Sequence, residues 1–261
     1  MQSARTLRAV HMALLACGLA AACNNASAVP YYYVDWTTAN VAGGTASGLI
    51  TLPDASTVNV AFSATFASGA PGNLYGAQTS GGINYWNPSS PYVSAQVDNA
   101  PPGTDIVQLS GGQSQIYTVT LSAAIKDPIM AIVSLGQPGV PTTYDFDSPF
   151  AIVSQGTGYW GGTSTSLTQL PGDILRGTEG HGTIQFLGTF STFSWTVPTP
   201  ESWHGFTFGI RTTEALEPNP VPEPASLALV GVALLGCVLA VRRKSRRQEP
   251  VPTVQRSQGI Y

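Results

Sequence analysis

Apolar side chains alternate with polar or small ones in the middle of the chain. Between Thr57 and Ala67 every second residue is apolar, and these residues are Val58, Val60, Phe62, Ala64 and Phe66. Successive side chains of a strand point to opposite faces, so a period of two predicts a half-buried β-strand. The chain must therefore build a sheet that buries one of its faces.

Further β-branched and aromatic runs predict more strands in the same region. They are bounded by Gly, Pro or Asp and cover 116–121, 129–135, 150–154, 184–186, 193–197 and 206–210. The apolar parity changes between Phe190 and Phe193, which predicts a turn or a bulge at Ser191-Thr192. No segment of the region has the period of an amphipathic helix.

The composition also favours short strands joined by turns. Only 10% of the residues are charged, while Gly and Pro number 28 and 20. We therefore predict an all-β fold, a single jelly-roll-like β-sandwich over residues 29–213 with about eight to ten strands. An up-and-down barrel is the alternative.

Residues 1–28 have the pattern of a secretory signal peptide. Arg5 and Arg8 precede a short apolar stretch, Met12–Ala22, and the segment ends in the triplet from Ala26 to Ala28. A basic start, a short apolar run and a small-residue site predict export and cleavage after Ala28. The apolar run is too short to cross a bilayer, whose core needs about 20 residues.

The cysteines give little support to a site in the middle region. Cys17 and Cys23 precede the predicted cleavage site, and Cys237 lies in a C-terminal apolar run. The exported region therefore has no disulfide, thiol nucleophile or cysteine metal ligand, and its stability must come from a packed core. Lipid attachment at Cys23 is a less favoured alternative to cleavage after Ala28.

The C-terminal segment predicts a membrane span. Residues 214–221 form a proline-rich spacer, and residues 225–241 carry no charge. Seventeen residues are at the lower limit for a transmembrane helix. The basic cluster at 242–247 predicts that the tail, residues 248–261, is cytoplasmic and that the preceding domain is outside.

The same segment resembles the PEP-CTERM sorting signal of exopolysaccharide-producing Gram-negative bacteria. The resemblance rests on Val-Pro-Glu-Pro-Ala-Ser-Leu from Val221, a glycine-containing apolar helix and a basic stop. It implies recognition by exosortase, a membrane-embedded cysteine peptidase-like enzyme. The recognised motif would be Pro222, Glu223 and Pro224, and the basic stop would be Arg242, Arg243, Lys244, Arg246 and Arg247. The segment is also known as an ice-binding protein C-terminal domain, a name that does not establish ice binding.

The charge of the middle region excludes one class of partner. Between Val29 and Val221 only three residues are basic, whereas twelve are acidic. Binding to a phosphate backbone depends on basic side chains, so no nucleic acid is expected to bind.

Aromatic residues in glycine-rich loops are candidates for contact with a glycan. The segments 69–91 and 156–168 are predicted to be long surface loops that carry five such residues, and Tyr92 follows the first of them. Exposed rings can stack on the apolar face of a sugar, and the candidates are Trp86, Tyr159 and Trp160. The favoured alternative is that the rings cap the sandwich and hold the loops.

The sequence predicts no catalytic residues. His181 and His204 are the only histidines after the predicted signal peptide, and Glu179 and Glu201 precede them at spacings typical of no metal site. A structural, hydrogen-bonded role is expected for both pairs. Paired carboxylates for glycan processing remain an alternative, because their separation is spatial.

No cofactor is expected, and the only metal candidate is weak. Asp145 and Asp147 would project to one side of an extended segment and could bind calcium with loop carbonyls. They lack the further acidic ligands of a standard calcium loop.

Together these features predict a non-enzymatic, exported protein. The precursor would be anchored in the membrane and processed by exosortase, and the product would reach the cell surface or the extracellular matrix. The domain would be a structural or adhesive module, with a carbohydrate-binding module for exopolysaccharide as the alternative. A glycan-processing enzyme and an ice-binding protein are less favoured, since the threonines of 163–168 are few and irregular.

Overall fold

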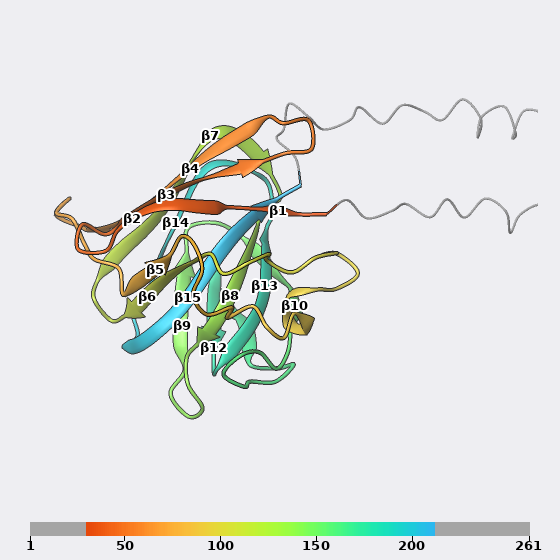
Figure 1. Cartoon of the computed structure of the whole chain (residues 1–261). Coiled ribbons are helices and arrows are strands. Elements are labelled where there is room, and N and C mark those ends of the chain that lie inside the picture. Colours follow the sequence, from red (N-terminus) through yellow and green to blue (C-terminus); the bar gives the residue numbers. More distant parts are fainter. Residues whose placement is uncertain (1–29, 212–261) are drawn as a thin grey trace, which may run out of the picture. The chain divides into compact units, whose positions relative to one another are not determined.

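Two antiparallel sheets form the described part of the chain (Figure 1). The structure is a computed structural model that describes residues 30–211, and within them there is no α-helix. The predicted all-β fold is thus confirmed, and the two sheets are consistent with a β-sandwich. None of these residues belongs to a helix long and apolar enough to cross a membrane. The predicted signal peptide, spacer, membrane helix and tail lie outside the described residues.

The first sheet has seven strands. In spatial order these are β10 (Phe150–Gln155), β13 (Gly180–Phe186), β8 (Ile129–Leu135), β15 (Glu201–Ile210), β6 (Ile106–Gly111) and β5 (Gly76–Gln78), with β1 (Tyr32–Tyr33) also paired to β15. A short 3₁₀ helix, η1 (Ser90–Tyr92), lies in the segment between β5 and β6.

The second sheet has eight strands. Their spatial order is β11 (Leu167–Leu170), β12 (Ile174–Gly177), β9 (Thr142–Phe146), β14 (Thr189–Thr196), β7 (Gln115–Lys126), β4 (Thr57–Phe66), β3 (Thr45–Thr51) and β2 (Asp35–Asn40). From β6 to β10 each strand lies in the other sheet from the one before it, a pattern that double-sheet jelly rolls share. The register between β14 and β7 shifts between Phe190 and Thr192, where the change of apolar parity predicts an irregularity.

Aromatic side chains from both sheets fill the main core. The ring of Phe62 on β4 lies 5.9 Å from that of Trp195 on β14 and 5.3 Å from that of Phe206 on β15. Phe62 and Trp195 belong to the eight-stranded sheet and Phe206 to the seven-stranded sheet, so their burial together joins the two sheets. The predicted face of β4 is confirmed, because Val58, Val60, Phe62 and Ala64 are all buried.

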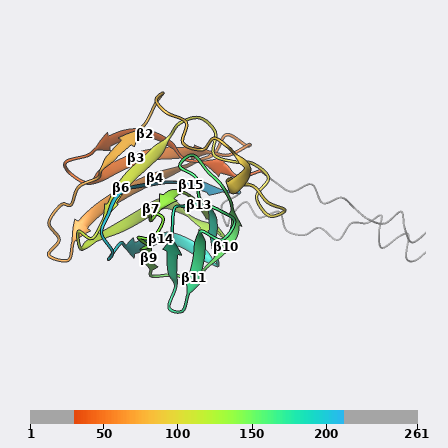
Figure 2. The same ribbon diagram turned by 90° about the horizontal axis from the view of Figure 1, so that it is seen from below.

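A second, smaller core lies on the other face of the seven-stranded sheet. The segment between β5 and β6 carries Trp86 and Tyr92, which pack with Ile129, Ala131 and Val133 of β8. Part of this segment, drawn in yellow, lies beside β10 and β13 (Figures 1 and 2). All seven residues of β8 are buried because the strand is covered on both faces.

Candidate functional site

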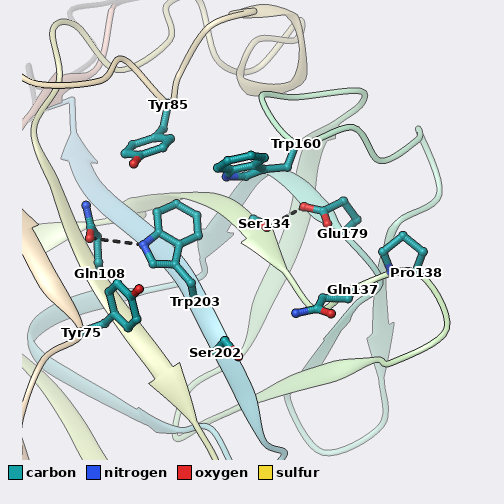
Figure 3. A pocket seen from close by; sticks show the side chains of 10 residues that line it. All are labelled: Tyr75, Tyr85, Gln108, Ser134, Gln137, Pro138, Trp160, Glu179, Ser202 and Trp203. Atoms are coloured by element: carbon teal, nitrogen blue, oxygen red, sulfur yellow. Dashed lines mark hydrogen bonds between the residues drawn. The ribbon is translucent and has the colours of Figure 1, made fainter.

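A groove of about 550 Å³ opens beside the second core. The seven-stranded sheet provides Gln108 of β6, Ser134 of β8 and the pair Ser202 and Trp203 of β15, and loops provide the remaining walls. Because Leu109 and Phe206 of these strands belong to the main core, the groove lies on the opposite, outer face. Its lining residues are Tyr75, Tyr85, Gln108, Ser134, Gln137, Pro138, Trp160, Glu179, Ser202 and Trp203 (Figure 3).

Four aromatic rings beside the groove form a closed cycle of contacts. The ring centroids of Tyr85 and Trp203 are 5.0 Å apart, and those of Tyr85 and Tyr159 are 5.1 Å apart. Trp160 closes the cycle, at 4.9 Å from Tyr159 and 6.4 Å from Trp203. Figure 3 shows Trp203 between Tyr85 on one side and Tyr75 on the other. The rings thus hold one another in place.

Several of these rings remain accessible to a ligand. Trp160 is 55% exposed, Tyr75 is 57% exposed and Tyr159 is 40% exposed. The indole Nε1 of Trp203 donates a hydrogen bond to Oε1 of Gln108 at 3.2 Å, which fixes the orientation of that ring. Burial and the neighbouring Tyr159 raise the pKa of the Tyr85 phenol, so its hydroxyl is a hydrogen-bond donor at neutral pH.

One carboxylate, that of Glu179, lines the groove. Ser134 donates its hydroxyl hydrogen to Oε1 of Glu179 at 2.5 Å, and both residues have a left-handed backbone, with φ of 57° and 61°. Such angles are strained for residues other than glycine, and they turn the two side chains toward each other. The Glu179 residue is 9% exposed, so its charge faces a partly dry environment.

The buried ring of His181 connects Glu179 with the second core. Its Nε2 lies 3.3 Å from Oε1 of Glu179, an ion-pair distance without the direction of a hydrogen bond. Its Nδ1 shares a hydrogen bond of 3.3 Å with the hydroxyl of Tyr92. The predicted structural role of His181 stays a prediction, and these contacts agree with it.

A glycine-rich turn places the aromatic pair above His181. Gly158 and Gly161 exchange backbone hydrogen bonds of 2.7 and 3.2 Å around Tyr159 and Trp160. A methyl group added at Gly158 would overlap the His181 ring. The close approach of backbone to imidazole therefore requires glycine at this position.

Ser134, one of the two serines that line the groove, is not prepared for nucleophilic attack. Ser134 donates to the carboxylate of Glu179, whereas an activated serine must donate to a base such as histidine. Glycoside hydrolysis needs two carboxyl groups, one on either side of the scissile bond. Among the described residues that line the groove, Glu179 is the one that carries a carboxyl group. The arrangement is suited to holding a ligand.

Glu201 and His204 form a separate buried pair. Oε2 of Glu201 lies 2.8 Å from Nδ1 of His204, and the two side chains are 1% and 0% exposed. The ring of Tyr144 packs on that of His204 at 5.2 Å, and burial followed by the charge of Glu201 raises the Tyr144 pKa. Glu201 also lines a smaller pocket of about 360 Å³, which shares Gln137 and Ser202 with the groove.

Of the three residues predicted as possible glycan contacts, two lie beside the groove and one is buried. Tyr159 and Trp160 lie in the aromatic cycle beside the groove. Trp86 needs a correction, because it is only 2% exposed and its Nε1 donates to the backbone oxygen of Asp105 at 3.2 Å. Its ring packs edge-on to Tyr92 in the second core and offers no face to a ligand.

Trp203 is the principal groove residue that the sequence analysis missed. It lies one position out of phase with the buried Phe206 and Phe208 of the same strand. This odd parity places its side chain on the outer face of the sheet. A tryptophan of the wrong parity in an otherwise buried strand was the available signal.

Asp145 and Asp147, the predicted calcium candidates, have different surroundings. Asp147 Oδ2 accepts hydrogen bonds from the backbone and the hydroxyl of Ser194, at 2.9 and 2.6 Å, whereas Asp145 is exposed. Within residues 30–211, no group of three acidic, histidine or cysteine side chains could hold a metal ion.

The predicted cleavage residues Ala26 and Ala28, the Pro222–Pro224 motif and the basic stop lie outside the described residues. No curated protein and no solved structure matches the chain. The family model of the PEP-CTERM protein-sorting motif matches residues 220–244. That match includes Pro222, Glu223 and Pro224 and implies exosortase-dependent sorting to the cell surface. The C-terminal segment of this chain thus matches the PEP-CTERM protein-sorting motif.

Proposed function

We propose that this protein is an adhesive surface protein that binds polysaccharide through the groove of its β-sandwich. The observation that carries the proposal is the set of accessible rings around polar groups: Trp160, Trp203, Tyr85 and Tyr75 beside Gln108 and Glu179. Sugar rings have one apolar face and a rim of hydroxyls. A groove of aromatic faces and side-chain amides is complementary to both features.

The sorting motif supports this proposal independently. An exported precursor, held by its C-terminal segment and processed by exosortase, delivers the domain to the cell surface, where exopolysaccharide is the abundant partner. Binding without turnover agrees with the finding that Ser134 is not prepared for nucleophilic attack. The protein would therefore link the matrix and act as a structural module.

Fractionation and intact mass of the exported protein test the sorting part. In cells with exosortase, we expect a mature chain that begins near Val29, lacks the residues beyond Pro222–Pro224 and is found at the surface or in the medium. Cells without exosortase should keep the full segment 225–261 in the membrane fraction. A C-terminal segment retained in both strains would contradict sorting by exosortase.

Glycan binding is tested with the exported protein on an array of neutral, cationic and acidic oligosaccharides, together with exopolysaccharide from the producing cells. Calorimetry then gives the affinity for the best oligosaccharide. Trp160→Ala and Trp203→Ala should each weaken binding by about tenfold or more, the usual effect of losing a central aromatic contact.

Leu187→Ala is the matched control, because Leu187 is exposed but does not line the groove. It should leave the affinity unchanged. The proposal fails if no glycan binds, or if the control weakens binding as much as the tryptophan variants. Shortened oligosaccharides in the mass spectrum after incubation would instead show a glycan-processing enzyme.

A further inference from the structure

The charge around the groove is negative. Residues 30–211 contain ten acidic and three basic residues. Arg211 is paired with Asp98 at 3.6 Å, and Arg176 and Lys126 belong to strands of the eight-stranded sheet. Among the described residues, the walls of the groove and of the smaller pocket hold Glu179 and Glu201 and no basic side chain.

The aromatic faces add to this negative potential. The face of an indole or phenol ring attracts a cation within about 6 Å of its centroid. Trp160 and Glu179 line the same groove, so a ring face and a carboxylate are available to one bound sugar (Figure 3). The hydrogen bond from Ser134 uses one lone pair of the Glu179 carboxylate, which can accept about four in all.

From this geometry we infer that the groove selects a polymer of amino sugars whose amino groups are free and therefore positively charged. The inference rests on the proposed glycan binding and names its ligand class. Each sugar would stack its apolar face on Trp160 or Trp203, and its ammonium group would lie beside Glu179. The low exposure of Glu179 strengthens this attraction, because less water screens it.

The same features disfavour the two other classes of polysaccharide. An acidic polymer would place carboxylates beside Glu179 in a groove without a compensating base, and like charges brought together oppose binding. An N-acetylated polymer is neutral and brings no cation to Glu179, whose nearest ionisable neighbour is the buried ring of His181. Both kinds of polymer could stack on the aromatic rings, so the charge of the sugar decides which polymer binds more tightly.

Three oligomers of equal length test the inference by calorimetry on the exported protein at mildly acidic pH, where sugar amines are protonated. They are oligomers of glucosamine, N-acetylglucosamine and galacturonic acid. The first two have the same backbone and differ at the nitrogen. We expect the glucosamine oligomer to bind about tenfold more tightly than its acetylated counterpart, the usual effect of one charge-assisted contact.

Glu179→Gln isolates the charge. Glutamine can still accept the hydrogen bond from Ser134, so the groove should keep its shape, while the preference for the glucosamine oligomer over its acetylated counterpart should disappear. Asp145→Asn removes the same charge from an exposed site on β9 and should keep the preference. For the unmodified protein, the preference should fall as salt is added, a result that does not depend on any variant folding.

The outcomes separate the inference from the proposed function. Equal binding of the two hexosamine oligomers, or tighter binding of the galacturonic acid oligomer, would overturn the inference and leave glycan binding intact. Failure of every oligomer and of the cells' own polysaccharide to bind would overturn both. A preference that survives in Glu179→Gln, or does not change with salt, would show that charge is not its cause.

Discussion

Glu201 and His204 form a buried pair, and breaking it should lower the stability of the fold strongly. Neither carboxylate oxygen of Glu201 has a partner with hydrogen-bond geometry, and the nearest ionisable group is the His204 ring at 2.8 Å. His204→Phe keeps an aromatic ring against Tyr144 but leaves a carboxylate alone inside the protein. We expect a loss of about 3–5 kcal/mol in the free energy of unfolding, the usual cost of breaking a buried pair.

Urea denaturation of four proteins measures this effect. They are the unmodified protein, the two single variants Glu201→Gln and His204→Phe, and the double variant. Since the double variant buries no charge at this site, it should recover most of the stability that His204→Phe loses. Simple addition of the two single effects would show that the pair is not coupled.

Gly158 is the residue on which the position of the aromatic loop depends. In Gly158→Ala the new methyl group would overlap the buried His181 ring, so the loop that carries Tyr159 and Trp160 must move. We expect a loss of about 1–3 kcal/mol in the free energy of unfolding, typical of overpacking, and weaker glycan binding.

Gly156→Ala, in the same loop, is the control for this variant. Its added methyl group would lie 3.5 Å from Pro91, an ordinary contact, and it should change neither quantity. Chemical denaturation and calorimetry measure the two properties. Equal stability of the two alanine variants would contradict the tight packing of Gly158 on His181.

Among single residues, the sequence distinguishes poorly between tryptophans that bind and those that pack. Trp86 lies in a Gly-, Ser- and Pro-rich segment and was a candidate for glycan contact, with packing against the sandwich as the favoured alternative, and it is buried. That segment folds back onto the outer face of β8, and the burial depends on pairs such as Trp86 and Asp105, 19 positions apart. Local composition cannot reveal such long-range coverage. Trp203 shows the opposite case, because its parity alone indicated the outer face.

Strand β4 shows how the alternation of residues becomes stability. Phe62 is buried between the sheets, whereas Phe66, with the same parity, is partly exposed at the end of the strand. Phe62→Ala would remove contacts with Tyr117, Trp195 and Phe206 and leave a cavity. We expect a loss of about 3–5 kcal/mol, the range found for buried phenylalanines.

Phe66→Ala removes the same atoms from the same strand and should cost clearly less. Urea denaturation of both variants gives the comparison. If the two losses are equal, the free energy does not come from burial between the sheets, and the position of the main core on this face of β4 is wrong.

At the level of elements, the strands with strong apolar alternation or with a continuous apolar run were the predictable ones. β4, β7, β8 and β14 coincide with predicted runs. β2 and β11 were not predicted, because they are edge strands rich in Thr and other polar residues, and only pairing with β3 and β12 holds them extended. Edge strands bury little and so show weak periodicity. The predicted sandwich did not depend on them.

The groove is formed by several strands and loops together. Its walls come from β6, β8 and β15 and from loops elsewhere in the chain, such as those that carry Trp160 and Glu179. Residues from Tyr75 to Trp203 therefore meet only after the sheet has formed. The sequence indicated the loop rings Tyr159 and Trp160 as candidates. It could not bring Glu179 to them, because that placement requires the turn before β13 and the contact with Ser134.

For the molecule as a whole, the buried tyrosines limit stability at alkaline pH. Burial raises the pKa of Tyr117 from its ordinary value of 10.0 to about 12. It also raises the pKa values of Tyr33, Tyr92 and Tyr144. In the unfolded chain these phenols lose their protons near pH 10, while the folded protein keeps them protonated. The unfolded state therefore binds fewer protons above that pH, and the free energy of unfolding must fall as pH rises.

Each such tyrosine should lower the free energy of unfolding by about 1.4 kcal/mol per pH unit between its unfolded and folded pKa values. Four of them acting together should make the melting temperature fall steeply above pH 10, the ordinary tyrosine value, with little contribution from these groups below it. Melting curves followed by circular dichroism, with tyrosinate absorbance recorded in parallel, measure this. Tyr117→Phe removes one titrating group and should make the decline shallower, although it also loses the bond to the Ser110 carbonyl and lowers stability throughout. An equally steep decline in Tyr117→Phe would contradict the prediction, because that variant has one buried titrating phenol fewer.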